Sequence, residues 1–370
     1  MPDIIVKVGD LFESNAQTLV NTVNCVGIMG KGIALEFKKR FPAMFKDYVR
    51  RCEAGEVKLG RPYLYRDLVQ KWILNFPTKD DWRSVSKLTD IVNGLEFLEA
   101  NYRQWGIKSL AVPPLGCGNG QLDWNVVGPT LFRHLGRLNI PVELFAPHGT
   151  PAEQLIPEFL SKTIFSESKA SIQITPAEVA LVGILSRIRK ERYHQPIGRV
   201  MFQKLAYFAT VSGLPTGLEF HRGSYGPFAP GLKKLIARLV NNGLVTETKR
   251  GHTFIIEPGP TYPDARERYR PQLLEWVPKV EKVADLFLRL QSTNDAEIAA
   301  TVHFVAEHLK RSGDVSEVTV LDEAKNWKAR RRPPLDESEL ASSIRYLNML
   351  GWMNIKGSRE LHGLEDEVFA

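Results

Sequence analysis

Cysteine is scarce in this chain of 370 residues, which contains only Cys25, Cys52 and Cys117. Their spacing fits neither a disulfide framework nor a zinc-binding motif, so the sequence predicts no metal site built on cysteine. Such a low cysteine content is typical of proteins that work in a reducing compartment. This observation favours a cytoplasmic location.

Long apolar segments are missing as well. No apolar run approaches the ~20 residues that a membrane-spanning helix needs, and the first residues, MPDIIVKVGD, turn polar too early for a secretory signal. With 43% hydrophobic and 25% charged residues, the composition is that of a soluble globular protein. The length favours about two domains, and we expect no membrane association.

The sequence also lacks a strongly basic arm. Its net charge of +7 is shared by both halves of the chain rather than concentrated in one tail. Such a charge is compatible with a nucleic-acid partner but does not establish one. A role on DNA therefore has to be argued from local motifs.

The segment VNTVNCVGIMGKGIA, the first glycine loop (20–34), looks like a phosphate-binding loop but fits neither familiar nucleotide motif. A Walker A loop would need glycine at the position of Cys25 and a hydroxyl residue at that of Gly32. The spacing of its glycines also differs from the dinucleotide fingerprint G-x-G-x-x-G. Two interpretations stay open: a loop that approaches an anion through backbone N–H groups at a helix start, or an ordinary strand-to-helix turn.

Strand-like and helix-like segments alternate through the first part of the chain. Short β-branched or aromatic runs predict strands, and longer runs with helical spacing predict helices. The alternation is typical of a layered α/β domain with helices on both faces of its sheet. The predicted strands are 4–8, 17–23, 63–65, 72–76, 109–113 and 142–147, and the predicted helices are 33–48 (interrupted at Pro42), 90–105 and 127–138.

Polar or glycine-rich segments follow several of these strands. Ligands of open α/β sheets bind at the carboxyl ends of the strands, and the N–H groups of two glycine loops can hold a diphosphate. Asp10 could accept a hydrogen bond from an exocyclic amine such as that of adenine, and Asn24 could bind ribose hydroxyls. The four segments are GDLF at 9–12, the first glycine loop, NFPTKDDW at 75–82, and the second glycine loop, PPLGCGNG, at 113–120.

Together these segments resemble a macrodomain, the ADP-ribose-binding fold of three α/β/α layers, which we assign to residues 1–155. More narrowly, the chain resembles the branch that contains terminal ADP-ribose glycohydrolases and DarG-type antitoxins. In that branch an essential catalytic lysine lies in an NFPTK-like segment, and the matching residue here is Lys79. The resemblance implies ADP-ribose as the ligand, no metal and no other cofactor. It also implies ligand contacts from Asp10, Leu11, Asn21, Asn24, Gly30, Lys31, Gly32, Thr78, Gly116, Cys117, Gly118, Asn119 and Gly120.

The chemistry expected of Lys79 is nucleophilic. An unprotonated amine can attack the anomeric carbon of ribose, or the opened aldehyde, and form a Schiff-base-type adduct. Such a lysine needs a pKa lowered by desolvation or by nearby cations. The neighbouring Asp80 and Asp81 act in the opposite direction, so Lys31, Arg83 or closure of the site would have to offset them. The alternative is a solvated loop lysine beside two aspartates.

One departure from the resembling enzymes concerns the second glycine loop. Protein-directed terminal glycohydrolases carry an aspartate at the position of Gly120, and the nearest acid here is Asp123. This difference weakens the case for a glutamyl ester on protein as the substrate. Cys117 has no evident histidine partner in the sequence, so we interpret it as a small packed residue rather than a nucleophile.

The second half of the chain differs in composition. A linker over 156–174 is followed by a mainly helical region, 175–370, in which helices precede a predicted β-hairpin at 246–257. This order is winged-helix-like, and two such units are expected, at 175–258 and 294–360. The run from QKLAYFA through LEFHRGSYGPFAPGLKKLIARLVNNGLV resembles antitoxin domains of the SocA/Panacea type, which bind toxins.

Six residues of this half are candidates for toxin contact. Alternatives stay open, since the tyrosine could simply pack in a turn and the basic run at 328–332 could be a solvated loop. The candidates are His221, Arg222, Tyr225, Lys233, Arg330 and Arg331.

The two resemblances together imply an antitoxin of the DarG type. Its macrodomain would remove ADP-ribose from thymidine in single-stranded DNA, and its second half would bind the DarT ADP-ribosyltransferase toxin. The alternatives are a hydrolase or reader of protein-linked ADP-ribose, and a winged-helix transcriptional regulator.

Overall fold

The computed structural model describes residues 4–67, 71–161, 174–251, 253–310 and 315–357. The chain divides into two compact units: the first is Met1–Gln173 with Lys233–Asn241, and the second is Ile174–Leu232 with Asn242–Ala370. The main break falls where the sequence predicted a linker, although residues 162–173 of that linker lie outside the described residues.

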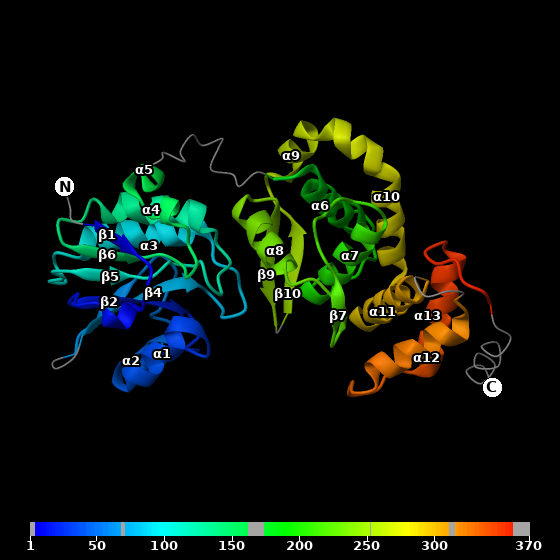
Figure 1. Ribbon diagram of the computed structural model, residues 1–370, viewed down its shortest axis with the longest axis horizontal. Coiled ribbons are helices and arrows are strands. Elements are labelled where there is room, and N and C mark those ends of the chain that lie inside the picture. Colours follow the sequence, from blue (N-terminus) through cyan, green and yellow to red (C-terminus); the bar gives the residue numbers. More distant parts are fainter. Residues whose placement is uncertain (1–3, 68–70, 162–173, 252, 311–314, 358–370) are drawn as a thin grey trace. The chain divides into compact units, whose positions relative to one another are not determined.

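The first unit is built on a six-stranded sheet in the order β1-β6-β5-β2-β4-β3 (Figure 1). All neighbours pair in parallel except β3, which lies antiparallel to β4 at one edge. The predicted strands are confirmed, but β4 runs further than expected, through Lys79. The strands are β1 Ile4–Lys7, β2 Thr18–Asn24, β3 Tyr63–Tyr65, β4 Trp72–Lys79, β5 Leu110–Val112 and β6 Val142–Phe145.

Helices cover both faces of this sheet, which confirms the three-layer α/β/α architecture. Figure 1 shows α1 and α2 on one face and α3 and α4 on the other. The helix expected over 33–48 is two helices, because Pro42 has no N–H group to continue the first and is well suited to start the second. The bounds are α1 Gly32–Arg40, α2 Pro42–Glu53, α3 Leu88–Asn101, α4 Trp124–Leu135 and α5 Pro157–Leu160, with short 3-10 turns η1 Leu11–Glu13 and η2 Ala152–Gln154.

Two hydrophobic cores fix the sheet between these layers. Successive side chains of a strand point to opposite faces, so Leu74 and Phe76 pack towards α3 and α4 while Ile73 packs towards α1 and α2. Helix α3 approaches β4 closely at Gly94, where an added Cβ would lie 2.4 Å from the Cζ atom of Phe76. This close packing holds β4, the strand that carries Lys79, in a defined position.

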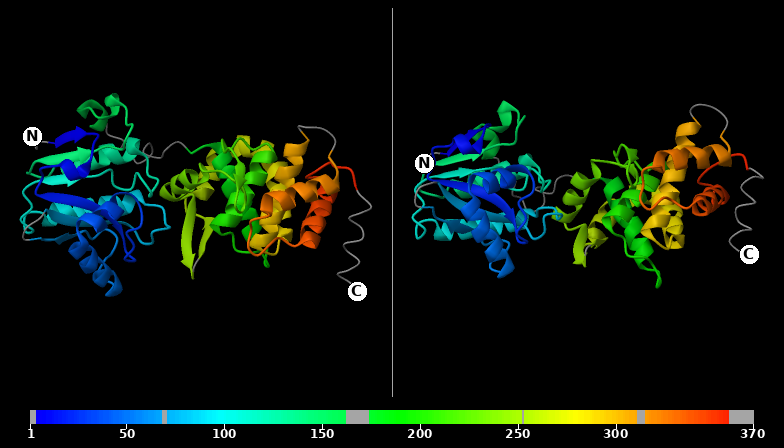
Figure 2. Two further views of the ribbon diagram at one scale, coloured as in Figure 1. Left: turned by 60° about the horizontal axis from the view of Figure 1, so that its bottom comes forward. Right: turned by 90° about the horizontal axis from the view of Figure 1, so that it is seen from below.

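The second unit is mostly helical, as predicted. Helices α7 and α11 pack against each other within it (Figures 1 and 2), and α10 packs on α6. Helix α6 begins with the expected capping box of Thr175 and Glu178. The helices are α6 Pro176–Arg189, α7 Arg199–Val211, α9 Tyr262–Arg268, α10 Arg270–Arg289, α11 Thr293–Leu309, α12 Glu317–Lys328 and α13 Glu337–Met349, with α8 Leu232–Asn241 counted in the first unit.

Two β-hairpins accompany these helices. One pairs β7 (His221–Gly223) with β8 (Gly226–Phe228), and the other pairs β9 (Val245–Arg250) with β10 (Thr253–Pro258). The second hairpin confirms the prediction for 246–257. The matching strand expected after the last helix is not found in the described residues up to 357, where Lys356 makes only an isolated bridge to Ser316.

Helices capable of spanning a membrane do not occur in the described part of the chain. In the same residues, no group of three or more histidine, cysteine, aspartate or glutamate side chains is arranged to hold a metal ion.

Candidate active site

The sheet itself brings Lys79 next to the first glycine loop. Strands β2 and β4 are parallel neighbours, and their register places Asn24 opposite Lys79 at the carboxyl ends of both strands. The register shifts between Val23 and Asn24, and such a bulge re-aims the residues that follow it. The two segments that the sequence identified separately therefore meet at one edge of the sheet.

The amine of Lys79 also reaches the second glycine loop. Its Nζ atom donates to the carbonyl of Asn119 at 3.0 Å and to the carbonyl of Ser84 at 3.2 Å. The residue is half-buried and belongs to the end of β4 rather than to a loop, while its catalytic role stays a prediction. Lys79 thus joins the end of β4, the turn that follows, and the second glycine loop.

A short turn over residues 80–84 sets the position of that lysine. Asp81 is buried, and its carboxylate accepts from the backbone N–H of Arg83 at 3.0 Å and pairs with the Arg83 guanidinium at 3.2 Å. The N–H of Ser84 closes the turn on the carbonyl of Asp81. Because Asp81 is engaged with Arg83, part of the negative charge expected beside Lys79 is offset within the turn.

The side chain of Asn24 shapes the first glycine loop. Its Oδ1 atom accepts from the N–H groups of Val26 and Ile28 at 3.0 and 3.3 Å and from the hydroxyl of the buried Tyr48 at 3.0 Å. A hydrogen bond from Asn24 to ribose would compete with these contacts. Asn24 therefore holds the loop in shape, and its contact with ribose stays a prediction.

Burial makes Cys25 a poor candidate for chemistry. Burial, followed by the nearby Cys52, raises the pKa of the Cys25 thiol to about 12. The backbone N–H of Cys25 donates to the carbonyl of Asp80 at 3.0 Å, which ties the first glycine loop to the turn after β4.

Three predicted ligand residues lie inside the fold instead. Asn21 is fully buried, and its Nδ2 atom donates to Oδ1 of Asn75 on the paired strand at 2.9 Å. Thr78 is also buried, with its hydroxyl directed to the carbonyl of Val23 at 3.4 Å, and the side chain of Leu11 belongs to the core. The side chains of these three residues are thus packed within the sheet and the core, and contact of these residues with the ligand stays a prediction.

The remaining residues of the first segments lie where an anion could approach. Lys31 is exposed at the N-cap of α1, with no side-chain hydrogen bond to the helix, and Gly32 begins the helix with a φ of +58°. Open N–H groups at a helix start attract anions. Asp10 caps η1 by accepting from Phe12 N–H at 3.0 Å, and about half of its side chain stays exposed.

The second glycine loop is closely packed at Gly120. A Cβ added there would lie 2.2 Å from the Ser86 hydroxyl oxygen and 2.4 Å from the Gly116 carbonyl oxygen. The Gly120 carbonyl accepts from Ser86 N–H at 3.0 Å. By contrast, a Cβ at Gly118 would meet nothing within 4 Å. The position at which protein-directed glycohydrolases carry an aspartate therefore has no room for a side chain here.

Cys117, in the same loop, is half-buried. Burial, with a smaller effect from the negative charge of Asp123, raises the pKa of its thiol to about 12. A thiol with so high a pKa is almost entirely protonated near neutral pH and a weak nucleophile. This supports the interpretation of Cys117 as a packed residue.

The β7–β8 hairpin of the second unit carries three of the six toxin-contact candidates. Tyr225 at its turn is 66% exposed, so the alternative of a packed tyrosine is wrong. His221 is exposed, and Arg222 pairs with Glu323 at 2.6 Å and stacks on Trp327. The hairpin thus presents aromatic and basic side chains on one short element.

Two buried lysines, Lys204 and Lys328, bind backbone carbonyls of this hairpin. Lys204 donates to the Pro227 carbonyl at 2.8 Å, and Lys328 donates to the Ser224 carbonyl and to Glu297, both at 2.8 Å. Burial, followed by the positive charge of Lys328, lowers the pKa of Lys204 to about 7. The charges beneath the hairpin therefore serve its structure.

The other candidates are dispersed. Arg331 is engaged within its own unit, since it donates to Asn294 at 2.9 Å and lies 3.4 Å from Glu297. These contacts hold the Arg331 side chain, and its contact with a toxin stays a prediction. The basic run is not simply a solvated loop, because Lys328 is buried. Arg330 is exposed, and Lys233 lies on α8, in the first unit rather than the second.

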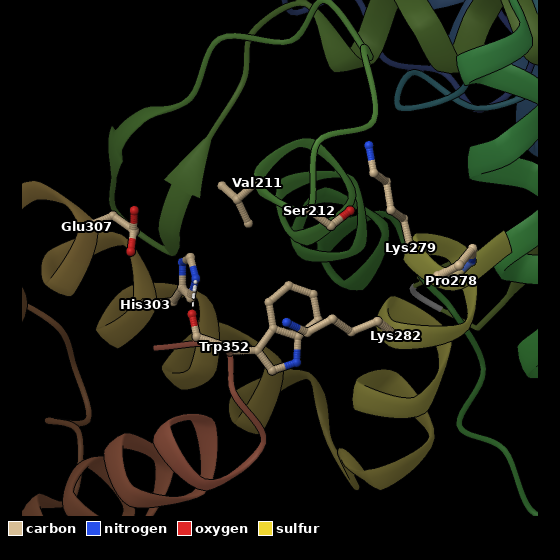
Figure 3. Close-up of a pocket in the computed structure, with 8 residues that line it drawn as sticks. All are labelled: Val211, Ser212, Pro278, Lys279, Lys282, His303, Glu307 and Trp352. Atoms are coloured by element: carbon tan, nitrogen blue, oxygen red, sulfur yellow. Dashed lines mark hydrogen bonds between the residues drawn. The ribbon is translucent and has the colours of Figure 1, made fainter. Parts of the chain in front are cut away.

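A cavity in the second unit was not anticipated from the sequence. Its volume is about 360 Å³, and His303 and Trp352 line it together with two lysines of α10 (Figure 3). Lys279 donates to the Gly213 carbonyl at 2.8 Å, and Lys282 lies over the Trp352 ring at 4.4 Å. The cavity had no sequence signal, because its lining comes from four separate segments.

The comparisons with known proteins agree with this geometry. A family model described as Macro domain matches residues 20–131. The DNA ADP-ribosyl glycohydrolase of Thermus aquaticus is 34% identical over 316 residues, which cover 81% of this chain and 81% of the relative. That of Mycobacterium tuberculosis is 32% identical over 354 residues, 87% of this chain and 93% of the relative.

A third relative joins two activities in its name. The DNA ADP-ribosyl transferase-DNA ADP-ribosyl glycohydrolase fusion protein of Thermosipho africanus is 42% identical over 172 residues, 41% of this chain and 44% of the relative. Because the similarity to the first two relatives extends over most of the chain and the site has the elements of a macrodomain, this protein belongs to the DNA ADP-ribosyl glycohydrolase family.

Proposed function

We propose that the first unit hydrolyses the bond between ADP-ribose and a thymine base in single-stranded DNA, with Lys79 as the nucleophile. The observation that carries this proposal is the position of Lys79. Its Nζ atom lies at the carboxyl edge of the sheet, between the turn after β4 and the second glycine loop, 3.0 Å from the Asn119 carbonyl. A reacting sugar between the two glycine loops would meet this amine.

The proposed reaction has two stages. The deprotonated amine of Lys79 attacks the anomeric carbon of the ribose, the bond from that carbon to the base nitrogen breaks, and the base leaves with the bonding electron pair and takes up a proton. Water then adds to the lysine adduct and releases ADP-ribose and the free amine. The N–H groups of the glycine loops hold the diphosphate, and Lys31 at the start of α1 adds positive charge.

The packing of Gly120 supports a substrate on DNA rather than on protein. The resembling protein-directed enzymes place an aspartate at this position, and the contacts of 2.2 and 2.4 Å to Ser86 and Gly116 leave no space for one here. This chain would therefore depend on its lysine rather than on a lysine–aspartate pair.

The experiment compares Lys79→Ala with the wild-type protein on an oligonucleotide that carries ADP-ribosylated thymidine. We expect loss of turnover with little change in the affinity for ADP-ribose, measured by calorimetry. Lys39→Ala, which removes an exposed lysine of α1, is the matched control. Turnover at the wild-type rate in Lys79→Ala would exclude Lys79 as the nucleophile, and turnover of ADP-ribosylated protein alone would exclude the DNA substrate.

We also propose that the second unit binds the ADP-ribosyltransferase that makes this modification, DarT. A relative is named as a fusion of a DNA ADP-ribosyl transferase with a DNA ADP-ribosyl glycohydrolase, so that the two activities occur in one polypeptide there. The low cysteine content is typical of a reducing compartment, and we propose that both proteins work in the cytoplasm.

The β7–β8 hairpin is the surface proposed for this contact. Tyr225 and Phe228 are 66% and 50% exposed on it, and the buried lysines beneath keep its backbone fixed. Exposed tyrosine and arginine on a rigid element are typical of residues that dominate protein interfaces. Tyr225→Ala should weaken binding of the transferase about tenfold or more, whereas Tyr193→Ala, at an 87% exposed tyrosine outside the hairpin, should not. Equal affinities of the two variants would remove the hairpin from the interface.

A further inference from the structure

Trp82 is the exposed tryptophan of this chain. The sequence contains seven tryptophans, all within the described residues, and Trp82 is the most exposed of them, at 47%. It lies at the tip of the 80–84 turn, three residues after Lys79. A large aromatic side chain that is exposed to solvent so close in sequence to the proposed nucleophile is a candidate for contact with a ligand.

The turn that carries Trp82 is held firmly. The buried carboxylate of Asp81 binds both the backbone N–H and the guanidinium of Arg83, and Ser84 N–H closes the turn at 3.0 Å. The carbonyl of the same Ser84 accepts from the Lys79 amine at 3.2 Å. The same hydrogen-bonded turn therefore carries the indole ring and holds the amine.

The surroundings of Trp82 suit a nucleobase. The guanidinium of Arg83 lies 5.3 Å from the centroid of the indole ring, which places a positive charge beside an aromatic face. Proteins that bind single-stranded nucleic acid combine such aromatic faces with basic groups, because every base can stack and every nucleotide carries a phosphate.

The neighbouring glycine loop extends this surface. Val26 and Ile28 are 42% and 44% exposed, and their loop is tied to the turn by the hydrogen bond from Cys25 N–H to the Asp80 carbonyl at 3.0 Å. Apolar side chains at the rim of a site can cover the flat faces and sugars of a strand that lies across it. A single strand of nucleic acid that crosses both loops would cover the exposed apolar groups of each.

We propose that Trp82 is a stacking platform for the base next to the modified thymidine in single-stranded DNA, with Arg83 contacting the adjoining phosphate. The proposal rests on the proposed DNA substrate and deepens it. Trp82 is a specificity-determining residue in this scheme: it binds the strand around the reacting nucleotide and does not touch the reacting bond.

The first test compares two substrates, an ADP-ribosylated thymidine nucleoside and a short single-stranded oligonucleotide with one ADP-ribosylated thymidine. Stacking on an aromatic side chain contributes enough that its removal should raise KM for the oligonucleotide about tenfold in Trp82→Ala. The kcat value and the turnover of the nucleoside should change little, and Trp82→Phe should restore most of the affinity. Ile156→Ala, at a 45% exposed apolar residue of the same unit, is the control.

The second test does not depend on turnover. Binding of an unmodified oligonucleotide is measured with the wild-type protein and with Trp82→Ala, together with binding of ADP-ribose. Weaker oligonucleotide binding with unchanged ADP-ribose binding supports the platform. Equal oligonucleotide affinities overturn it, as does a matching loss for ADP-ribose, which would mean that Trp82 stacks on the adenine instead. If the wild-type protein hydrolyses no modified DNA, the proposed function is wrong. The comparison of oligonucleotide affinities then still supports or overturns the stacking platform by itself.

Discussion

Replacing Gly120 by alanine should be among the most damaging small changes in the first unit. The new methyl group would lie 2.2 Å from the Ser86 hydroxyl oxygen, 2.8 Å from its Cβ atom and 2.4 Å from the Gly116 carbonyl oxygen. The Ser86 hydroxyl could rotate away about its χ1 angle, but the Ser86 Cβ atom and the Gly116 carbonyl cannot, so the loop itself must shift. Overpacking of this kind costs about 1–3 kcal/mol.

The loss should be visible in both stability and activity. For a unit of this size, such a cost lowers the melting temperature of its transition by roughly 2–12 °C. The loop also carries the Asn119 carbonyl that holds Lys79 at 3.0 Å. Misplacement of a catalytic group by about 1 Å can cost about 100-fold in rate, so we expect kcat to fall at least tenfold while the second unit keeps its own thermal transition.

Two further variants make this prediction strict. Gly118→Ala changes the same loop at a position where a Cβ meets nothing within 4 Å, so it should leave the melting temperature close to wild type. Ser86→Gly removes one of the two obstructing groups, so in a double-mutant cycle it should recover part of the loss caused by Gly120→Ala. The reasoning is refuted if Gly120→Ala melts within about 1 °C of wild type with normal kcat, or if Gly118→Ala lowers the melting temperature as much as Gly120→Ala does.

Two other predictions concern the second unit. Burial lowers the pKa of His303 to about 4, and in the neutral ring Nε2 donates to the Trp352 carbonyl while Nδ1 accepts from the Tyr207 hydroxyl. The unfolded chain therefore binds more protons than the folded chain between about pH 4 and 6.5. The free energy of unfolding should fall by a few kcal/mol as the pH is lowered through that range. Urea unfolding at several pH values should show this slope, and His303→Asn should flatten it. Glu297→Gln should destabilise the unit by about 3–5 kcal/mol, because it leaves the buried Lys328 without its counterion. The melting temperature measures this loss of stability. Glu339→Gln, at an exposed contact of α13, is the control.

Local sequence patterns predicted the secondary structure well where one strong signal was present. The alternation of β-branched runs with helical periodicity located all six strands of the first unit, and Pro42 marked the boundary between α1 and α2. Thr175 and Glu178 marked the start of α6. Such signals depend on a few neighbouring residues, and for that reason they can be recognised without knowledge of the fold.

Side-chain roles were harder to predict where they depend on distant partners. Asn21 was expected at the ligand because it precedes a glycine loop, and the sequence did not indicate that its side chain donates to Asn75 on the neighbouring strand. Arg331 was expected at a toxin because it belongs to a basic run, and the sequence did not indicate its contacts with Asn294 and Glu297 of α11. The sequence distance to these partners is large, and only the packing of strands and helices decides which polar groups meet.

The sequence by itself determined the motifs of this protein: two glycine loops, the lysine between them, and the absence of the residues that a nucleoside-triphosphate site requires. Short-range chemistry sets these features, since glycine spacing and strand ends are local. The tertiary structure alone decided how they combine. It set Lys79 between Ser84 and Asn119, closed position 120 to any side chain, and left Trp82 exposed on the turn that follows Lys79. These properties arise from close approach between segments that the chain keeps apart.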